Sequence, residues 1–266
     1  TTDHEYPAMD NTWDFVAART GAAYIHHPMP LPMTTPEDFV ERFWSAVTPA
    51  TKVIFISHIT CQTALIFPIG EIIRRARAAG ILTIIDGAHA PSQIPLNLDA
   101  LGADIYVAAC HKWLCAPKGS AFLYARPEVH HLLDPLVISR GVGYEPVNGR
   151  SSLVAWQEAQ GTRDVSAFLS VPAAIRFQQE HDWDAVRARC HALAVATRDR
   201  VHALTGLETI SPEDWFSQLV SIRLPDNTDL SALHRALWED HRIEVPIGRW
   251  NGQAYVRVSF QAYNDE

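Results

Sequence analysis

The chain has 266 residues, of which 47% are hydrophobic and 20% are charged, as is ordinary for a globular domain with ample core. Its formal net charge of -8 and the lack of a basic stripe argue against nucleic acid or an anionic membrane as a partner. The longest apolar runs stop well short of the ~20 residues that a membrane span needs, and no signal peptide opens the chain. Four cysteines without CxxC pairing fit a reducing compartment, so we expect a cytoplasmic protein.

Apolar runs of strand length alternate with amphipathic helical stretches along the first half of the chain. This pattern predicts an α/β fold with a mostly parallel sheet flanked by helices. The predicted helix covers residues 69–80, with Gly80 at its C-cap. Because the strand runs are almost continuously hydrophobic, we expect both faces of the sheet to be covered. The predicted strands are 52–57, 82–86, 105–109 and 120–125.

The sequence pattern changes after residue 145. A turn-rich stretch is followed by helices from about 165 to 204 and then by a strand-like run, 218–225. A helix at 229–240 and a second strand-like run, 254–260, complete the chain. We therefore expect a large domain over 1–150 and a smaller α+β domain over 151–266.

Two short motifs carry the chemistry. Asp86 ends the apolar run ILTIID, at the end of a strand where parallel sheets place their ligands, and Lys112 follows the apolar run DIYVAAC. Only three of the 22 basic residues are lysines, and Lys112 stands between a His and a Trp, so a generic surface role is a poor explanation for it. A strand-end acid and a lysine beyond a second strand are what pyridoxal 5'-phosphate requires. The lysine forms a Schiff base, and the carboxylate keeps the pyridine nitrogen protonated.

Other polar residues have simpler explanations. His89 could be a satisfied core histidine, but its position three after Asp86 lets its ring reach the coenzyme's phenolic oxygen or lie near its plane. The pairs His26-His27 and His130-His131 lack Cys, Asp or Glu at ligand spacing, so we expect no metal. The run GVGYEP (141–146) lacks the third glycine of a dinucleotide loop. Cys110 and Cys115 are expected to pack rather than to react.

Three segments together resemble one enzyme family. They are SHITCQTALIFPI, the long run from ILTIIDGAHA through CHKWLCAPKGSAFLYARPE, and WQEAQGTRDVSAFLSVPAAI. They are similar to the class V aminotransferase superfamily of fold type I pyridoxal-phosphate enzymes, and most of all to the branch around isopenicillin N epimerase. The resemblance implies that Lys112 carries the coenzyme and that Asp86 is the partner of the pyridine nitrogen.

The resemblance also implies roles for residues around this pair. Tyr6 matches the family's stacking residue, and His58 matches the residue that contacts coenzyme oxygen or substrate. His111 is similar to the phosphate-side histidine that precedes the lysine. Within GTRD, Thr162 resembles the threonine that reaches the phosphate of the neighbouring subunit, and Arg163 would lie close to substrate. Arg257 resembles the arginine that grips the substrate carboxylate.

Two departures from the family pattern matter. The family begins roughly a hundred residues earlier, with a helix N-terminus that binds the coenzyme phosphate, and it ends with a closing helix, so we expect the chain to be incomplete at both ends. Cysteine desulfurases of the family carry a persulfide-forming cysteine in the loop before the small domain. There is none between Cys115 and Cys190, which disfavours that activity.

The resulting hypothesis is a pyridoxal-phosphate enzyme that acts at the Cα of a small-molecule amino-acid substrate, epimerase-like or carbon-sulfur lyase-like, in a homodimer with shared active sites. An aminotransferase remains an alternative. The alternative from another functional class is a non-catalytic remnant that acts as a binding or dimerisation module.

Overall fold

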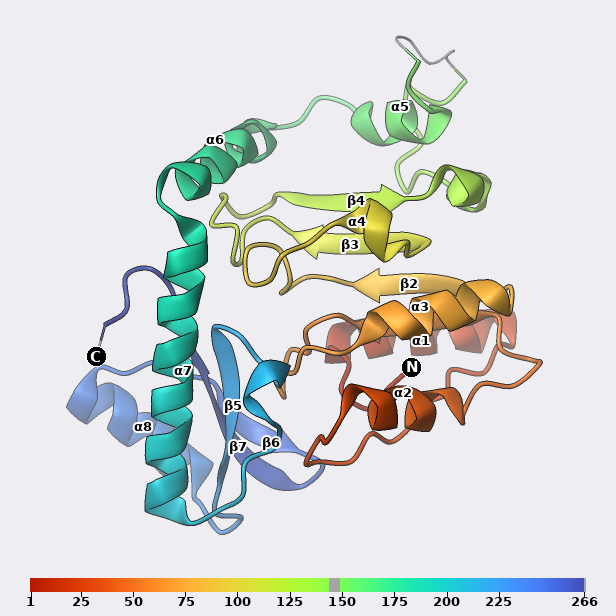
Figure 1. Ribbon diagram of the computed structural model, residues 1–266. Coiled ribbons are helices and arrows are strands. Elements are labelled where there is room, and N and C mark those ends of the chain that lie inside the picture. The colour runs from red at the N-terminus through yellow and green to blue at the C-terminus, as the bar shows by residue number, and fades with distance from the viewer. Residues whose placement is uncertain (144–148, 266) are drawn as a thin grey trace.

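The computed structural model describes residues 1–143 and 149–265, and its first half is built on a four-stranded sheet (Figure 1). The strand order is β1-β2-β3-β4. β1, β2 and β3 are parallel, as predicted, whereas β4 runs antiparallel to β3. The strands are β1 (Val53–Ser57), β2 (Leu82–Asp86), β3 (Ile105–Ala109) and β4 (Ala121–Ala125).

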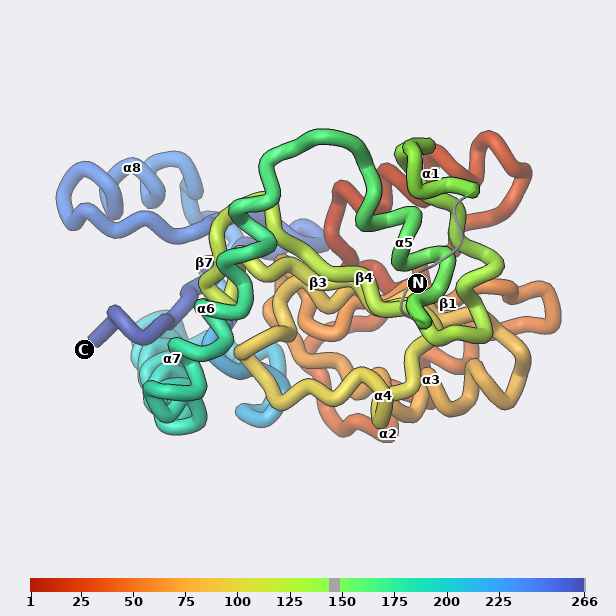
Figure 2. Tube along the Cα trace, turned by 90° about the horizontal axis from the view of Figure 1, so that it is seen from above, coloured from red at the N-terminus to blue at the C-terminus, as the bar shows by residue number. Residues whose placement is uncertain are grey.

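Helices lie on both sides of this sheet. Figure 2 shows α1 on the opposite side from α2, α3 and α4. α3 buries Ile69, Ile72, Ile73 and Ala76, which recur at helical spacing along one face. The helices of this half are α1 (Pro7–Thr20), α2 (Pro36–Trp44), α3 (Ile69–Ala78) and α4 (Leu98–Leu101), followed by the 3-10 helix η1 (Pro127–Leu132).

One predicted boundary was wrong by a residue. The C-cap of α3 is Ala79, in a right-handed conformation, and Gly80 follows it with a φ of 69°. Glycine adopts this left-handed conformation without the steric penalty of a Cβ, so Gly80 ends the helix from the position after the cap. Part of the run 141–146 lies outside the described residues.

The second half contains a separate three-stranded antiparallel sheet in the order β5-β7-β6. The long helix α7 packs on β5, where Ala194 meets Val220 and Ile222 in one apolar cluster. The helices here are α5 (Ser152–Glu158), α6 (Ser166–Glu180), α7 (Trp183–Thr205) and α8 (Leu230–His241), with the 3-10 helix η2 (Glu213–Trp215). The strands are β5 (Leu219–Leu224), β6 (Ile247–Trp250) and β7 (Gln253–Ser259).

The two sheets meet across a shared apolar core. Trp250 and Tyr255 of the second sheet belong to the same buried cluster as the residues under the first. The Trp250 indole donates a hydrogen bond to the Asp3 carbonyl (2.9 Å), and the Ser217 hydroxyl donates one to the Gln93 carbonyl (3.0 Å). The predicted elements of both halves are present, while the division into domains at residue 150 stays a prediction.

A membrane-spanning helix is not found in the part of the chain that the structure describes, since no helix there is both long and apolar enough to cross a bilayer.

Candidate active site

Asp86 lies at the carboxyl edge of the first sheet, the edge to which parallel strands bring their ends. It is the last residue of β2, in register with Ser57 of β1 and Val107 of β3. Its Oδ1 accepts a hydrogen bond from the Ala88 amide (2.9 Å). Burial raises the pKa of Asp86, and the nearby charge of Lys112 works in the opposite direction. The other carboxylate oxygen has no hydrogen-bond partner among the described residues, so it is available to a cationic N–H group.

Lys112 is carried by the connection between β3 and β4. This connection is closed at its base, because the Cys110 amide donates to the Ser120 carbonyl (3.0 Å) and the Ala116 amide donates to the Cys110 carbonyl (3.0 Å). Lys112 remains exposed, but its partial burial lowers the pKa of the amine; the charge of Arg257 lowers it further, and those of Cys61 and Asp86 oppose the shift. The amine is therefore more easily deprotonated than a solvated lysine.

His89 joins the two motifs. Its Nε2 lies 3.2 Å from Nζ of Lys112, and its Nδ1 accepts a hydrogen bond from the Trp113 indole at 3.1 Å. The turn that carries His89 is held by Gln93, whose side-chain amide donates to the His89 carbonyl (2.8 Å). Burial is the main cause that lowers the pKa of His89 to about 3, and the charges of Lys112 and Arg257 add to it. The imidazole is therefore neutral at physiological pH.

Arg257 reaches the site from the other sheet. It lies on β7, and its guanidinium donates to the Cys61 carbonyl and lies 3.2 Å from Cys61 Sγ. Its Nε has no hydrogen-bond partner among the described residues. A cavity of about 150 Å³ borders Arg257 and is also lined by Gln62, Ser221 and Tyr255. A guanidinium group beside a cavity suits the binding of a carboxylate.

The remaining predicted residues are placed around this centre. The His58 amide donates to the Asp86 carbonyl (2.8 Å), and the buried His58 ring lies with Nδ1 2.9 Å from the Tyr106 hydroxyl. His111 is exposed and donates from Nδ1 to the Ser120 carbonyl (3.2 Å). Tyr6 is the N-cap of α1 and is 47% exposed, next to a glutamate that binds the end of β1.

Thr162 and Arg163 are not brought to Lys112. Both are exposed in the connection between α5 and α6, where the Arg163 guanidinium lies 5.0 Å from the centre of the Phe168 ring. No hydrogen bond or ion pair within the described ranges links either residue to the site. Their predicted role toward a neighbouring subunit therefore stays a prediction.

Sequence reasoning missed three contributors to this arrangement. Trp113 fixes the ring of His89, Cys61 contacts Arg257, and Tyr106 pairs with His58. Tyr106 carried a signal, because it is a hydroxyl-bearing residue inside an otherwise apolar strand. Cys110 is buried as expected, whereas Cys115 is exposed, at a φ of 61°, and so does not pack in the core.

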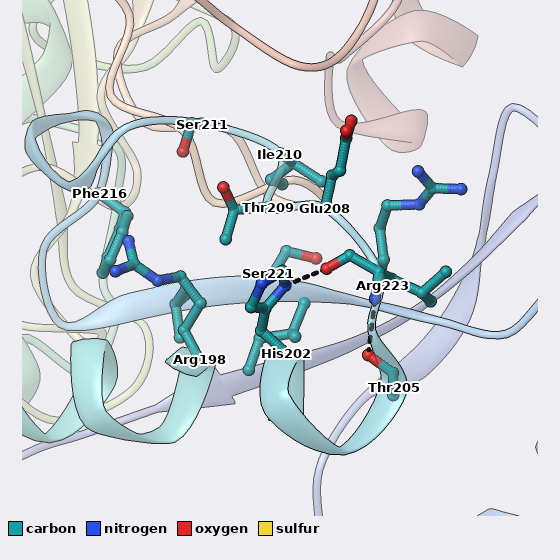
Figure 3. Close-up of a pocket in the computed structure, with 13 residues that line it drawn as sticks. Arg198, His202, Thr205, Glu208, Thr209, Ile210, Ser211, Phe216, Ser221 and Arg223 are labelled. Carbon is teal, nitrogen blue, oxygen red and sulfur yellow. Dashed lines mark hydrogen bonds between the residues drawn. The ribbon is translucent and has the colours of Figure 1, made fainter. Parts of the chain in front are cut away.

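A second cavity, between the end of α7 and β5, is too small to be a substrate site (Figure 3). It is lined by Arg198, His202, Thr205 and Ser221 among others, but its volume is only about 10 Å³. That is room for about one water molecule. His202 and Thr205 also bond within the chain, to the carbonyl and amide of Leu207.

Comparison with known proteins points to one family. The family model described as "Aminotransferase class-V" matches residues 1–266. The chain is 35% identical to isopenicillin N epimerase of Amycolatopsis lactamdurans, over 100% of this chain and 69% of that protein. It is 27% identical to a putative L-cysteine desulfhydrase 2 of Oryza sativa subsp. japonica, over 98% of this chain and 61% of that protein.

A solved structure shares the fold at lower identity. It is a variant of the lyase C-DES with glycine covalently linked to its PLP cofactor. The TM-score is 0.82 at 20% identity, over 100% of this chain and 70% of that one. This likeness supports the predicted fold type, in which a mixed, mainly parallel sheet is flanked by helices.

Proposed function

Because the chain belongs to the class V aminotransferase family, we propose that it acts with pyridoxal 5'-phosphate at the Cα of an amino acid. The observation that carries the proposal is the 3.2 Å separation between Lys112 Nζ and His89 Nε2, beside the strand-end carboxylate of Asp86. The residues fit the coenzyme: a lysine of lowered pKa can attach it, and a half-buried carboxylate with one unpartnered oxygen can accept the pyridine N–H.

When bound, pyridoxal phosphate supplies an electron sink for the charge that develops at Cα. The chain's own residues then have distinct tasks. Lys112 would hold the coenzyme, and its Nζ, when free, would be the base that takes the Cα proton of the substrate. Asp86 keeps a proton on the pyridine nitrogen by accepting its hydrogen bond. Arg257 binds the substrate carboxylate and so orients the Cα–H bond toward Lys112.

The outcome that we favour is epimerase-like or carbon-sulfur lyase-like. The relatives named above as an epimerase and a putative desulfhydrase support these two outcomes together, and an aminotransferase remains the alternative. A desulfurase is disfavoured, because there is no cysteine between Cys115 and Cys190 and Cys190 is buried inside α7. Epimerisation, elimination and transamination differ only in where the proton or the leaving group goes after the Cα–H bond breaks.

We further propose a homodimer in which Thr162 and Arg163 serve the neighbouring subunit's site, since both are exposed and neither is linked to Lys112 by a hydrogen bond or ion pair among the described residues. The compartment that we expect is the cytoplasm, as argued from the cysteine pattern.

The experiment that tests the function is addition of pyridoxal phosphate to the purified protein, followed by borohydride reduction and peptide mapping. We expect a visible absorbance band and a pyridoxyl group on Lys112. Lys112→Ala should abolish the attachment, whereas Lys118→Ala, the control in the same loop, should keep it. A pyridoxyl group on Lys118 would overturn the assignment, and no absorbance change at any coenzyme concentration would favour a non-catalytic module.

A further inference from the structure

The protonation state of His89 can be deduced from its two neighbours. The indole nitrogen of Trp113 is a donor only, and it lies 3.1 Å from Nδ1 of His89. A donor needs an acceptor, so Nδ1 carries no proton. A neutral imidazole bears one N–H group, and in His89 it must therefore be at Nε2.

The same logic extends to Lys112. The Nε2–H group of His89 faces Nζ of Lys112 at 3.2 Å. An ammonium group has no lone pair and cannot accept a hydrogen bond, whereas a free amine can. The opposite arrangement, in which the ammonium donates to Nε2, would place the remaining ring proton on Nδ1, so that it would point at the Trp113 N–H. The Trp113 contact therefore selects the arrangement with a neutral amine.

Trp113 is itself held rigidly. Its side chain is buried in a cluster with Ala64 and Leu219. Gln178 of α6 donates its side-chain amide to the Trp113 carbonyl (3.3 Å), and the Ser92 hydroxyl in turn donates to Gln178 Oε1 (2.7 Å). The indole N–H is consequently fixed in place by elements on both sides of the loop.

We propose that Trp113 is a positioning residue that fixes the Nε2–H tautomer of His89 and thereby keeps the Lys112 amine neutral. A neutral amine is the form that attacks a carbonyl carbon, so the contact would prepare Lys112 for coenzyme attachment. The charged or titratable groups that face the amine are Asp86, Cys61 and Arg257. The role of the neutral Lys112 amine in coenzyme attachment rests on the proposed function, but the tautomer of His89 is a property of the coenzyme-free chain.

The test is 15N nuclear magnetic resonance of the histidine-labelled, coenzyme-free protein, in which the imidazole nitrogens report directly whether each bears a proton. His89→Gln identifies the resonances of His89 among the 13 histidines. We expect an unprotonated Nδ1 and a protonated Nε2 throughout the neutral pH range. A protonated Nδ1 in the unmodified protein would overturn the proposal without any variant.

Trp113→Phe removes the indole donor and should convert His89 from a single tautomer to a mixture of its two neutral tautomers. The matched control is Trp183→Phe, because the buried Trp183 indole N–H has no hydrogen-bond partner within residues 1–143 and 149–265. His89 signals that are the same in the Trp113 variant as in the unmodified protein would also overturn the proposal.

The reactivity of Lys112 supplies a second readout. Reductive methylation with formaldehyde near pH 7, followed by peptide mass spectrometry, gives the rate at Lys112 relative to Lys118 in the same molecule. We expect this ratio to fall about tenfold in Trp113→Phe, the effect of a pKa increase of about one unit. An unchanged ratio would contradict the proposal. Neither measurement contains pyridoxal phosphate, so failure of the proposed function would leave both results intact.

Discussion

The ring of Tyr106 lies against the backbone of Gly87, in the space where any other residue at position 87 would place its Cβ. Gly87 directly follows Asp86. The Tyr106 hydroxyl lies 2.9 Å from Nδ1 of His58. The absence of a side chain at Gly87 thus allows a buried tyrosine to pass beneath the turn that leads from Asp86 to His89.

Gly87→Ala should therefore destabilise the fold by roughly 1 to 3 kcal/mol, because the new methyl group would overlap the fully buried Tyr106 ring. Urea denaturation gives the free energy of unfolding. Gly70→Ala is the matched control, since a Cβ there meets no atom within 4 Å and alanine favours the helix. The cost of Gly87→Ala should shrink in a Tyr106→Leu background; an equal cost in both backgrounds would show that the ring is not the obstacle.

Asp86→Asn should keep the covalent attachment of the coenzyme at Lys112 but lower the rate by orders of magnitude. A neutral amide does not keep a proton on the pyridine nitrogen, and each ~1.4 kcal/mol of lost transition-state stabilisation costs about tenfold. The rate can be followed as exchange of the Cα hydrogen of a panel of amino acids in deuterated water. Asp99→Asn, at an exposed carboxylate bound to Tyr124, is the control and should catalyse this exchange at the rate of the unmodified protein. Near-normal exchange in Asp86→Asn would mean that this acid is structural.

Glu5 makes folding stability depend on pH. Its carboxylate accepts hydrogen bonds from the Ser57 amide (2.9 Å), the Ser57 hydroxyl (2.6 Å) and the Thr2 hydroxyl (2.7 Å), yet burial raises its pKa from 4.5 to about 7. Below pH 4.5 the group is protonated in both the folded and the unfolded chain. As the pH rises toward 7, the unfolded chain releases this proton first, so the free energy of unfolding falls, by about 3 kcal/mol in total.

The glutamine substitution isolates this effect. In Glu5→Gln the amide oxygen can still accept from Ser57 and the amide nitrogen can donate to Thr2, so the fold should persist without the pH-dependent contribution. Unfolding by urea at pH 5 and pH 8 should give a smaller difference for Glu5→Gln than for the unmodified chain. The exposed Glu208→Gln is the control and should keep the original difference. Equal differences in all three proteins would refute the role of Glu5.

Shared active sites predict complementation between inactive subunits. A heterodimer of Lys112→Ala with the Thr162→Ala, Arg163→Ala double variant would contain one site with all its residues, and we expect partial recovery of activity. A heterodimer of Lys112→Ala with Asp86→Asn should not recover, because Lys112 and Asp86 act in the same subunit. No recovery in verified heterodimers of the first pair would count against sharing.

Short apolar runs in the sequence predict the strands of the first sheet. The strands that end at Ser57, Asp86 and Ala109 were placed within about one residue, because strands buried on both faces are hydrophobic throughout. Their carboxyl ends locate Asp86, and the connection that follows β3 locates Lys112. The antiparallel direction of β4 was not specified, since the apolar run 120–125 carries no signal of strand direction.

The rest of the site depends on long-range packing. Arg257 and Cys61 are separated by 196 positions, and their contact requires the second sheet to be seated against the first. The bond from Trp113 to His89 depends on the orientation of an indole ring, which local sequence does not specify. Glu5 and Ser57 meet across 52 positions for the same reason. Hydrophobic periodicity predicts the strands and helices, but not which polar atoms of distant segments come within hydrogen-bond distance.

The connection that carries Lys112 leaves β3 and returns along β4, and its two ends are tied by the bond from the Cys110 amide to the Ser120 carbonyl. It is therefore a hairpin whose ends are part of the sheet ladder. Closing a short loop whose ends are already paired costs little additional entropy. Local opening at the tip can fray residues near Cys115 without displacing the lysine, which stands only two positions beyond the Cys110–Ser120 pair. In amide hydrogen exchange, the protection of Cys110 should then follow the global unfolding of the sheet, and the anchorage of the lysine should last as long as the fold does.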